Sequence, residues 1–184
     1  MLKLIISDFD GTLVDTFEAN FLAYKEAFQR LNLDLSREKY RECFGFRFDK
    51  FMEAAGVSDI EVVGMIKKHK ADLYPTHFDL LKPNSALIEL IRHFRQTGGK
   101  TALASTAARP NLLNALRHIG AIEDFDLILS GESVEKGKPD PEIYQKVLDY
   151  FNVEPGDAIV FEDSEIGRLA AIGAGIPVVV LRGF

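Results

Sequence analysis

The second half of the sequence alternates between short apolar runs and amphipathic segments, and this alternation limits the possible folds more than any other feature. The apolar runs are predicted strands at 100–105, 126–129, 158–161 and 177–181. Predicted helices precede these strands, at 84–97, 109–119, 140–151 and 165–173. Strands that are apolar on both faces are typical of parallel sheets with helices on both sides. The pattern therefore predicts an α/β fold built on a doubly wound, Rossmann-like parallel sheet.

The first part of the chain follows a different pattern. A strand is expected at residues 2–8, and residues 17–31 show the periodicity of an amphipathic helix. Two or three further short helices are expected near 36–43, 46–55 and 59–73. No strand pattern occurs until the α/β alternation begins. We therefore expect residues 1–15 and 82–184 to form the α/β core, and residues 16–81 to form a small helical cap inserted after the first strand.

Composition and charge exclude several classes of function. The chain of 184 residues is 47% hydrophobic and has a formal net charge of −6, without a long run of lysine or arginine. Nucleic acids and membranes are therefore not expected as partners. No apolar stretch is long enough to cross a bilayer and the amino terminus lacks a signal-peptide pattern, so we expect a cytoplasmic protein. The single cysteine, Cys43, is expected to be a buried apolar residue.

Two carboxylates, Asp8 and Asp10, follow the first predicted strand and precede Gly11 and Thr12. Because side chains alternate along a strand, Asp8 and Asp10 leave on the same side while Phe9 points to the other. Carboxylates that lie this close repel each other, and a hard cation such as Mg²⁺ relieves the repulsion. A solvated acidic turn is the alternative, and this stretch alone does not decide between the two.

Other polar residues stand where further predicted strands end. They are Ser105 and Thr106 after one strand, Glu162, Asp163 and Ser164 after another, and Lys138 in the loop before the helix at 140–151. Ligands of doubly wound sheets bind outside the carboxyl ends of the strands. Hydroxyl, amine and carboxylate groups are therefore expected to converge with the first two aspartates at one edge of the sheet.

Structural roles are the alternatives for these residues. Ser105 suits a strand-end cap, and Lys136 and Lys138 suit solvated loop positions. The acidic pair at 162–163 and the serine after it suit the cap of the next helix. Acidic groups at two neighbouring strand ends favour a metal site over these roles, and the following proline favours Lys138 over Lys136 as the site residue.

Four motifs in this order resemble those of the haloacid dehalogenase superfamily of phosphohydrolases, over residues 7–175. They are Asp8-Phe9-Asp10-Gly11-Thr12-Leu13-Val14-Asp15-Thr16, Ser105 after Leu103-Ala104, Gly137-Lys138-Pro139-Asp140-Pro141, and Phe161-Glu162-Asp163-Ser164-Glu165-Ile166-Gly167. The branch that the chain resembles contains phosphoglycolate phosphatases and β-phosphoglucomutases. In that branch a mobile helical lid, the C1 cap, follows the first motif.

The resemblance implies a role for each motif residue. Asp8 is implied as the nucleophile that forms an aspartyl-phosphate, and Asp10 as the acid and base that serves the leaving group and the attacking water. The implied metal is Mg²⁺, held by Asp8, the Asp10 carbonyl and Asp163, with Glu162 reached through a water molecule. The implied phosphate-binding residues are Gly11, Thr12, Ser105, Thr106 and Lys138.

The cap is the place where relatives carry specificity residues. Arg47 is therefore a candidate for a substrate anion, and a surface charge beside a phenylalanine core is the alternative. Hinges are expected near residues 15–16 and 80–83. Lys67, Lys68 and Lys70 are expected to form a solvated helix face.

Departures from the family pattern bear on the reaction. Mutases of this branch usually carry a histidine where this chain has Asn20, and true dehalogenases lack the second aspartate, here Asp10. Phosphonate-cleaving relatives need a lysine from the cap, and no lysine of this sequence can be assigned to that position. We therefore expect a Mg²⁺-dependent phosphatase of a small phosphorylated metabolite. The alternatives are a phosphomutase of the β-phosphoglucomutase type and a catalytically silent binding or regulatory protein.

Overall fold

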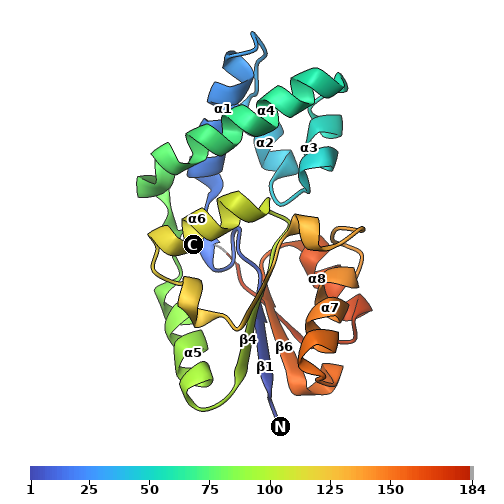
Figure 1. The fold of residues 1–184 in the computed structure, drawn as a ribbon. Coiled ribbons are helices and arrows are strands. Elements are labelled where there is room, and N and C mark those ends of the chain that lie inside the picture. The colour runs from blue at the N-terminus through green and yellow to red at the C-terminus, as the bar shows by residue number, and fades with distance from the viewer. Residues whose placement is uncertain (183–184) are drawn as a thin grey trace.

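A five-stranded parallel sheet forms the centre of the computed structural model, which describes residues 1–182 (Figure 1). The strand order is β5-β4-β1-β6-β7, and each neighbouring pair is parallel. The strands are β1 Leu4–Ser7, β4 Lys100–Ala104, β5 Leu127–Leu129, β6 Ala158–Glu162 and β7 Val178–Val180. The chain order reverses on the two sides of β1, which places a ligand site at the carboxyl end of that strand. The predicted doubly wound α/β fold is confirmed.

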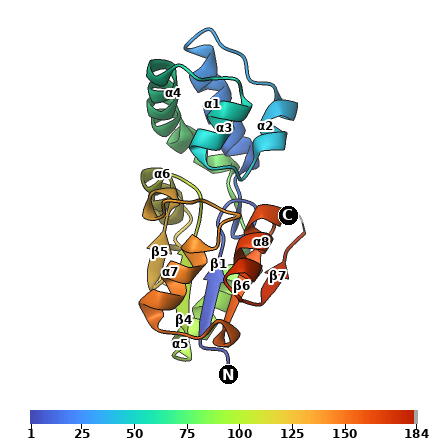
Figure 2. The same cartoon turned by 90° about the vertical axis from the view of Figure 1, so that its right-hand side faces the viewer.

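Helices cover both faces of this sheet, as Figures 1 and 2 show from two sides. They are α5 Ser85–Gln96 and α6 Arg109–His118 on one face, and α7 Glu142–Phe151 and α8 Glu165–Gly173 on the other. The alternation of β1 side chains connects both layers. Ile5 packs in the apolar cluster that includes α5 and α6, whereas Leu4 and Ile6 pack in the cluster that includes α7 and α8. The central strand is therefore buried on both sides.

The cap is a helical layer above the carboxyl ends of the strands (Figure 2). Its helices are α1 Phe17–Gln29, α2 Arg37–Cys43, α3 Phe48–Ala54 and α4 Ile60–Leu73, followed by a 3₁₀ helix at Tyr74–Leu80. Ser36 and Asp59 cap the amino ends of α2 and α4 by accepting backbone N–H bonds. The 3₁₀ helix was not predicted, because the apolar periodicity of α4 stops at its end.

Aromatic rings fill the centre of the cap, and Tyr40 lies in the middle of them. The centroids of five rings lie 5.4–6.0 Å from that of Tyr40, and they belong to Phe17, Phe21, Tyr24, Phe44 and Phe51. Ring pairs at these distances stabilise a core beyond the area they bury. These rings belong to the apolar cluster that also contains Ile5 and the buried faces of α5 and α6, so the cap and the α/β core are continuous in their packing.

Two linkers join the cap to the core, and they pair with each other. β2 Val14–Asp15 and β3 Lys82–Pro83 form a short antiparallel ladder. The N–H of Asn84 also donates to the carbonyl of Leu13 at 2.8 Å. The division of the chain at residues 15–16 and 81–82 stays a prediction, and the ladder lies at both of these points. Among residues 1–182, none of the helices is both long and apolar enough to span a lipid bilayer.

Candidate active site beneath the cap

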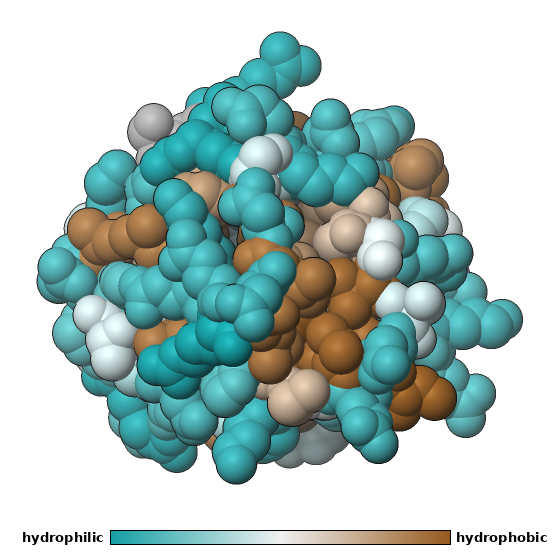
Figure 3. Space-filling view, turned by 90° about the horizontal axis from the view of Figure 1, so that it is seen from above, coloured by the Kyte–Doolittle hydropathy of each residue, from teal (hydrophilic) through white to brown (hydrophobic). Residues whose placement is uncertain are grey.

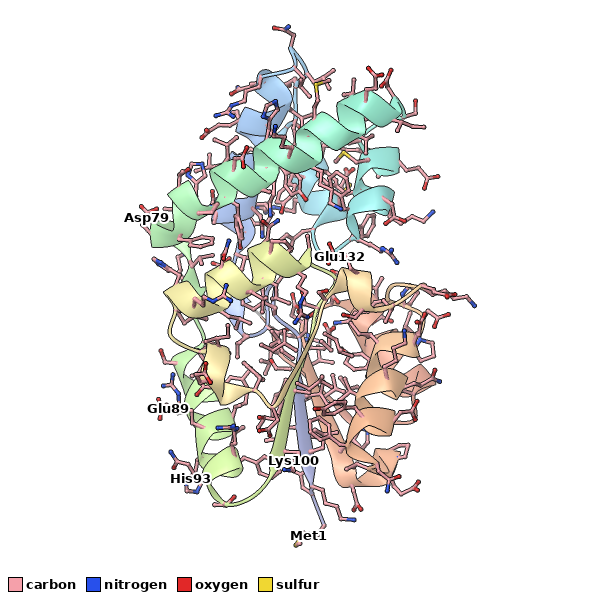
Figure 4. The ribbon with its side chains drawn as sticks, in the orientation of Figure 1. Met1, Asp79, Glu89, His93, Lys100 and Glu132 are labelled. Carbon is pink, nitrogen blue, oxygen red and sulfur yellow. The ribbon has the colours of Figure 1, made fainter. Side chains whose placement is uncertain are left out.

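Polar side chains collect at the carboxyl edge of the sheet, directly under the cap. In Figure 4, Met1 and Lys100 mark the opposite edge, and Glu132 marks the level of the site. The N–H of Asp8 donates to the carbonyl of Phe161 at 3.0 Å, which extends the pairing of β1 with β6 by one residue. This pairing brings the residue after β1 beside the end of β6. The expected convergence of groups from different strands is therefore present.

Lys138 connects three strand ends. Its Nζ lies 2.7 Å from Oδ1 of Asp8, 2.6 Å from Oε1 of Glu162 and 2.9 Å from the carbonyl oxygen of Ala104. Only 2% of the Lys138 side chain is exposed, so the alternative of a solvated loop lysine is wrong. Burial by itself lowers the pKa of Lys138, but the carboxylates of Asp8 and Glu162 outweigh it and hold the pKa well above its ordinary value. Lys138 is therefore a fixed positive charge inside an acidic cluster.

Glu162 holds this lysine in place. Besides Lys138, its Oε1 accepts a hydrogen bond from the hydroxyl of Tyr144 at 2.9 Å. Its Oε2 accepts from the backbone N–H of Asp163 and Ser164 and from the Ser164 hydroxyl, at 3.0–3.2 Å. A side chain at Gly167 would overlap the Glu162 carboxyl, so glycine is needed there. Both oxygens of Glu162 are occupied by protein donors, and its predicted contact to a metal through water stays a prediction.

Asp8, Glu162 and Asp163 form an acidic cluster in which one carboxylate oxygen from each lies within 4.8 Å of the others. Asp163 Oδ1 accepts from the Thr12 hydroxyl at 2.9 Å. Gly11 has a φ of +88° and a side chain there would overlap the Asp163 carboxylate, so this approach requires glycine. The Gly11 N–H donates to the carbonyl of Val14, and the Thr12 hydroxyl is held by Asp163. Their predicted role in phosphate binding remains a prediction.

The cluster suits a hard divalent cation. Burial raises the pKa of Asp163 to about 6, with the charge of Glu162 adding to the effect and the Thr12 hydroxyl opposing it. Burial likewise raises the pKa of Asp8, against the opposing charge of Lys138. Crowded, desolvated carboxylates of this kind are stabilised by a cation, and a donor set made only of oxygen fits Mg²⁺ or a similar ion. The residues present therefore fit the metal that the sequence predicts.

Asp10 turns away from this cluster toward the cap. Its Oδ1 accepts from the Thr16 hydroxyl at 2.5 Å and from the Asn20 amide at 3.1 Å. Its Oδ2 lies 3.5 Å from the Ser105 hydroxyl. Burial raises the pKa of Asp10 above its ordinary value, although the Thr16 hydrogen bond acts in the opposite direction. Asp10 therefore has a different environment from Asp8, and a raised pKa suits a group that donates a proton.

Ser105 and Thr106 link the strand end of β4 to its surroundings. The Ser105 hydroxyl accepts from the N–H of Ala107 at 3.0 Å, which is the capping role named as its alternative, and it also contacts Asp10. The Thr106 hydroxyl donates to the Gly45 carbonyl of the cap at 3.2 Å. Both residues lie at the site, and their predicted contact with phosphate stays a prediction.

Arg47 reaches from the cap to the loop that carries Lys138. Its Nη1 donates to the carbonyl oxygen of Glu135 at 2.9 Å and lies 3.5 Å from that of Val134. Its Nε lies 3.5 Å from Oδ1 of Asp49. In this arrangement the guanidinium joins the cap to the core. Its predicted role in substrate specificity stays a prediction.

Two cavities meet at Asp10. The smaller one, of about 20 Å³, is lined by Asp8, Lys138, Glu162 and Asp163, and we name it the phosphoryl chamber. The larger one, of about 80 Å³, lies between Asp10 and the aromatic core of the cap, and we name it the leaving-group chamber. Its aromatic lining consists of Tyr24, Tyr40, Phe44, Phe46, Phe48 and Phe51. Four residues line both chambers, and they are Asp10, Phe44, Gly45 and Thr106.

Lys70 corrects the prediction of a solvated lysine face on α4. Lys70 is 6% exposed, and its Nζ lies 3.8 Å from the centroid of the Tyr74 ring. Burial lowers the pKa of Lys70 to about 7, and the charge of Asp10 opposes this shift. The sequence held a signal for this, because Ile66, Lys70 and Leu73 follow the i, i+4, i+7 spacing of a buried helix stripe. Lys70 is thus a lining residue of the leaving-group chamber that the sequence reasoning missed.

Comparison with known proteins agrees with this geometry. The family model described as haloacid dehalogenase-like hydrolase matches residues 5–181. A phosphorylated carbohydrates phosphatase of Thermotoga maritima is 32% identical over 95% of this chain and 82% of its own length. A β-phosphoglucomutase of Bacillus subtilis is 27% identical over 95% of this chain and 81% of its own length. CbbY of Rhodobacter sphaeroides, solved with phosphate, superposes with a TM-score of 0.89 at 30% identity, over 100% of this chain and 88% of that one. The resemblance found in the sequence is confirmed, and the chain belongs to the haloacid dehalogenase-like hydrolase family.

Proposed function

We propose that this protein is a Mg²⁺-dependent phosphatase that hydrolyses a small phosphomonoester through an aspartyl-phosphate intermediate. The observation that carries the proposal is the meeting of two chambers at the Asp10 carboxyl. One chamber holds a carboxylate nucleophile beside a buried cation, and the other has room for an alcohol. A proton donor between them stands where the bond from phosphorus to the leaving oxygen breaks.

Asp8 is the proposed nucleophile. Lys138 binds its Oδ1 at 2.7 Å, which leaves Oδ2 for attack on phosphorus. The new bond joins Oδ2 to phosphorus, and the bond from phosphorus to the alcohol oxygen breaks with its electron pair on that oxygen. Lys138 also places a positive charge where negative charge gathers on the phosphoryl oxygens. Ser105 and Thr106 are the proposed hydroxyl contacts on the β4 side.

Asp10 is the proposed proton carrier. In its protonated form it gives a proton to the departing alcohol oxygen, and the resulting carboxylate then takes a proton from the water that attacks the aspartyl-phosphate. The bonds from Thr16 and Asn20 fix the orientation of its carboxyl during both steps. Hydrolysis returns Asp8 to the free carboxylate and releases inorganic phosphate. Asp10 loses one proton in the first step and regains one in the second, so it ends the turnover in its starting form.

Asp8, Asp163 and the carbonyl of Asp10 are the proposed ligands of Mg²⁺, with Glu162 at the edge of the site. When bound, the ion neutralises the carboxylates and the phosphoryl group as they approach each other. The cap residues close the site from above, and the Arg47 and Thr106 contacts to the opposite layer hold this closed arrangement. Exclusion of bulk water strengthens the electrostatic interactions inside.

Phosphate release from an aryl phosphate, measured with Mg²⁺ and with a chelator, tests the proposal. Activity should require the divalent ion and should be lost in Asp8→Asn. The matched control is Asp149→Asn, a carboxylate on α7 outside the site, which should keep wild-type activity. An inactive wild-type protein, or an active Asp8→Asn variant, would contradict the proposal.

A phosphomutase is the second candidate, because a β-phosphoglucomutase is among the relatives. Asn20 stands where mutases of this branch usually carry a histidine, and its amide binds Asp10. We infer that water is the usual acceptor of the phosphoryl group here. An assay that follows interconversion of phosphohexose isomers, primed with the bisphosphate, separates the two activities. A protein that binds phosphorylated metabolites but turns over none of them would instead support the silent, regulatory alternative.

A further inference from the structure

The ionisable groups that line the leaving-group chamber are of both signs, Asp10 on one side and Lys67 and Lys70 on the other. Arg47 of the cap is bound to a backbone carbonyl and does not line the chamber. Lys70 is buried against the Tyr74 ring. Lys67 lines the chamber with an exposed side chain, near the ring of Phe48. The Asp10 carboxyl forms the opposite end of the chamber. A second phosphate or a carboxylate would meet Asp10, and an ammonium group would meet the two lysines.

Most polar groups of the chamber are already bonded within the protein. The Asn20 amide donates to Asp10, and the Thr106 hydroxyl donates to Gly45. The hydroxyls of Tyr24 and Tyr40 differ, because neither makes a hydrogen bond with another residue in the range 1–182. Both tyrosines line the chamber together with Asp10. Burial raises the pKa of both hydroxyls, and the charge of Asp10 adds to the effect. These two hydroxyls and the side-chain amide of Asn111, which also lines the chamber, can bind a neutral polar atom of a substrate.

The chamber is also small. Its volume of about 80 Å³ is roughly half that of a 150 Å³ cavity, which is the size known to hold one benzene molecule. Under the closed cap, it therefore has room for roughly three or four non-hydrogen atoms beyond the ester oxygen. Six aromatic rings line it, so the carbon face of a bound alcohol would pack against ring surfaces. Figure 3 shows the molecule from above, with apolar surface between the hydrophilic side chains.

We propose that the leaving-group chamber selects phosphate monoesters of short, uncharged alcohols of two or three carbons, with one further hydroxyl or carbonyl that binds Tyr24 and Tyr40. This inference rests on the proposed phosphatase function and narrows its substrate class. It separates this chain from enzymes that act on sugar bisphosphates and hexose phosphates. Size excludes hexose phosphates from the closed chamber, and size together with the second phosphate excludes sugar bisphosphates. The two hydroxyls select among the small neutral esters.

A series of esters of equal size tests the charge requirement. The probes are hydroxyethyl phosphate, phosphoglycolate and phosphoethanolamine, whose alcohols end in a hydroxyl, a carboxylate and an ammonium group. The neutral ester should have a kcat/KM roughly tenfold or more above both charged ones, because a buried charge without a partner costs more than one hydrogen bond is worth. Hydroxypropyl phosphate should resemble hydroxyethyl phosphate, and glucose phosphate should be poorer by a similar factor.

The tyrosine contacts are tested by comparing hydroxyethyl phosphate with propyl phosphate, which lacks the terminal hydroxyl. In Tyr24→Phe and Tyr40→Phe, the kcat/KM ratio of the first ester to the second should fall roughly three- to tenfold, the value of one hydrogen bond. Tyr150→Phe on the exposed side of α7 is the matched control, and its ratio should equal that of the wild type. An unchanged ratio in both chamber variants would overturn the role of these hydroxyls.

Acetyl phosphate distinguishes failure of this inference from failure of the proposed function. Hydrolysis of acetyl phosphate together with a preference for phosphoglycolate, phosphoethanolamine or glucose phosphate would overturn the substrate class and leave the phosphatase function standing. Absence of hydrolysis for acetyl phosphate and for every ester would overturn both.

Discussion

The hydroxyl of Tyr144 donates a 2.9 Å hydrogen bond to the Glu162 oxygen that also binds Lys138. Tyr144 lies on α7 and is fully buried, and the Lys138 ammonium is 5.0 Å from the centre of its ring. Helix α7 therefore reaches the candidate site through a residue that touches neither Asp8 nor Asp163. Because the same Glu162 oxygen binds both groups, the hydrogen bond from Tyr144 also restricts the position of Lys138. A hydrogen-bond network of this kind fixes the positions of its side chains, in addition to the stability that its individual bonds contribute.

Removal of the Tyr144 hydroxyl should therefore affect both stability and turnover. Tyr144→Phe keeps the ring and deletes a bond to a charged group, which is worth about 1.5–3 kcal/mol. We expect a loss of stability in this range in denaturant unfolding, and a fall in kcat that exceeds the change in KM because Lys138 is less firmly placed. Tyr150→Phe serves as the control on the same helix. A variant with wild-type stability and wild-type kcat would contradict the role of Tyr144.

Lys138 neutralises two buried carboxylates, so its removal should destabilise the protein. Lys138→Met leaves Asp8 and Glu162 without their cation, and breaking a buried pair from one side costs about 3–5 kcal/mol. We expect a loss of this size in urea unfolding, together with loss of phosphatase activity. The control is Lys136→Met, because 75% of that side chain is exposed. Equal stabilities of the two variants would show that the acidic cluster does not depend on Lys138.

Substitution of glycine by alanine should lower stability at Gly11 and raise it at Gly64, because the two positions differ in backbone conformation and in free space. Gly11 has a φ of +88° and no room for a side chain beside Asp163, so Gly11→Ala should lower both stability and Mg²⁺ affinity. Gly64 lies inside α4 with open space around it, so Gly64→Ala should raise stability by about 0.5–1 kcal/mol through helix propensity. Thermal unfolding of both variants, with and without Mg²⁺, checks the pair. Stabilisation by both alanines would contradict the close approach of Asp163.

Local patterns in the sequence were sufficient for the five strands of the central sheet, the α-helices and the motif positions, but not for β2, β3 or the 3₁₀ helix at Tyr74–Leu80. Apolar runs and helix periodicity depend on neighbouring residues, and parallel strands bring their carboxyl ends to one edge whatever the details of packing. Those two facts placed Asp8 near Asp163 and Lys138 near both.

Contacts between distant elements could not be predicted in the same way. The turn of Asp10 toward Thr16 and Asn20 depends on where α1 begins relative to β1. The bond between Tyr144 and Glu162 depends on how α7 packs on the sheet. Lys70 combined two opposing signals, because its charge indicated solvent while its spacing on α4 indicated burial. Packing of the cap over the sheet decided in favour of burial.

Binding of Mg²⁺ should stabilise the folded protein in a pH-dependent manner. A ligand present at a hundred times its dissociation constant adds about 2.7 kcal/mol to stability. The pKa of Asp163 is raised to about 6, so its carboxylate is mostly protonated at pH values near 5 and charged near 8. The rise in melting temperature on adding Mg²⁺ should therefore be larger near pH 8 than near pH 5. Asp163→Asn should abolish the shift, and an equal shift in that variant would place the ion elsewhere.

The buried lysine of the cap should give the protein a stability that rises with pH. Lys70 has a pKa of about 7 in the folded chain and an ordinary value of 10.5, so between these values the unfolded chain holds a proton that the folded chain lacks. Unfolding then takes up a proton, and stability increases by about 1.4 kcal/mol per pH unit in this window, whereas below it both states are protonated and the slope vanishes.

Lys70→Met removes this pH-dependent contribution to stability and keeps an apolar side chain of similar length in the cap. Its advantage in unfolding free energy over the wild type should be largest at pH values below about 7 and should shrink by roughly 2 kcal/mol between pH values near 7 and near 9. Denaturant unfolding at several pH values between these limits measures the difference, in which the other titrating groups cancel. Lys68→Met, at an exposed position two residues earlier on α4, should show no such trend. Parallel pH profiles for wild type and Lys70→Met would mean that Lys70 stays charged beside Asp10, since only a lysine that loses its proton on folding can produce the slope.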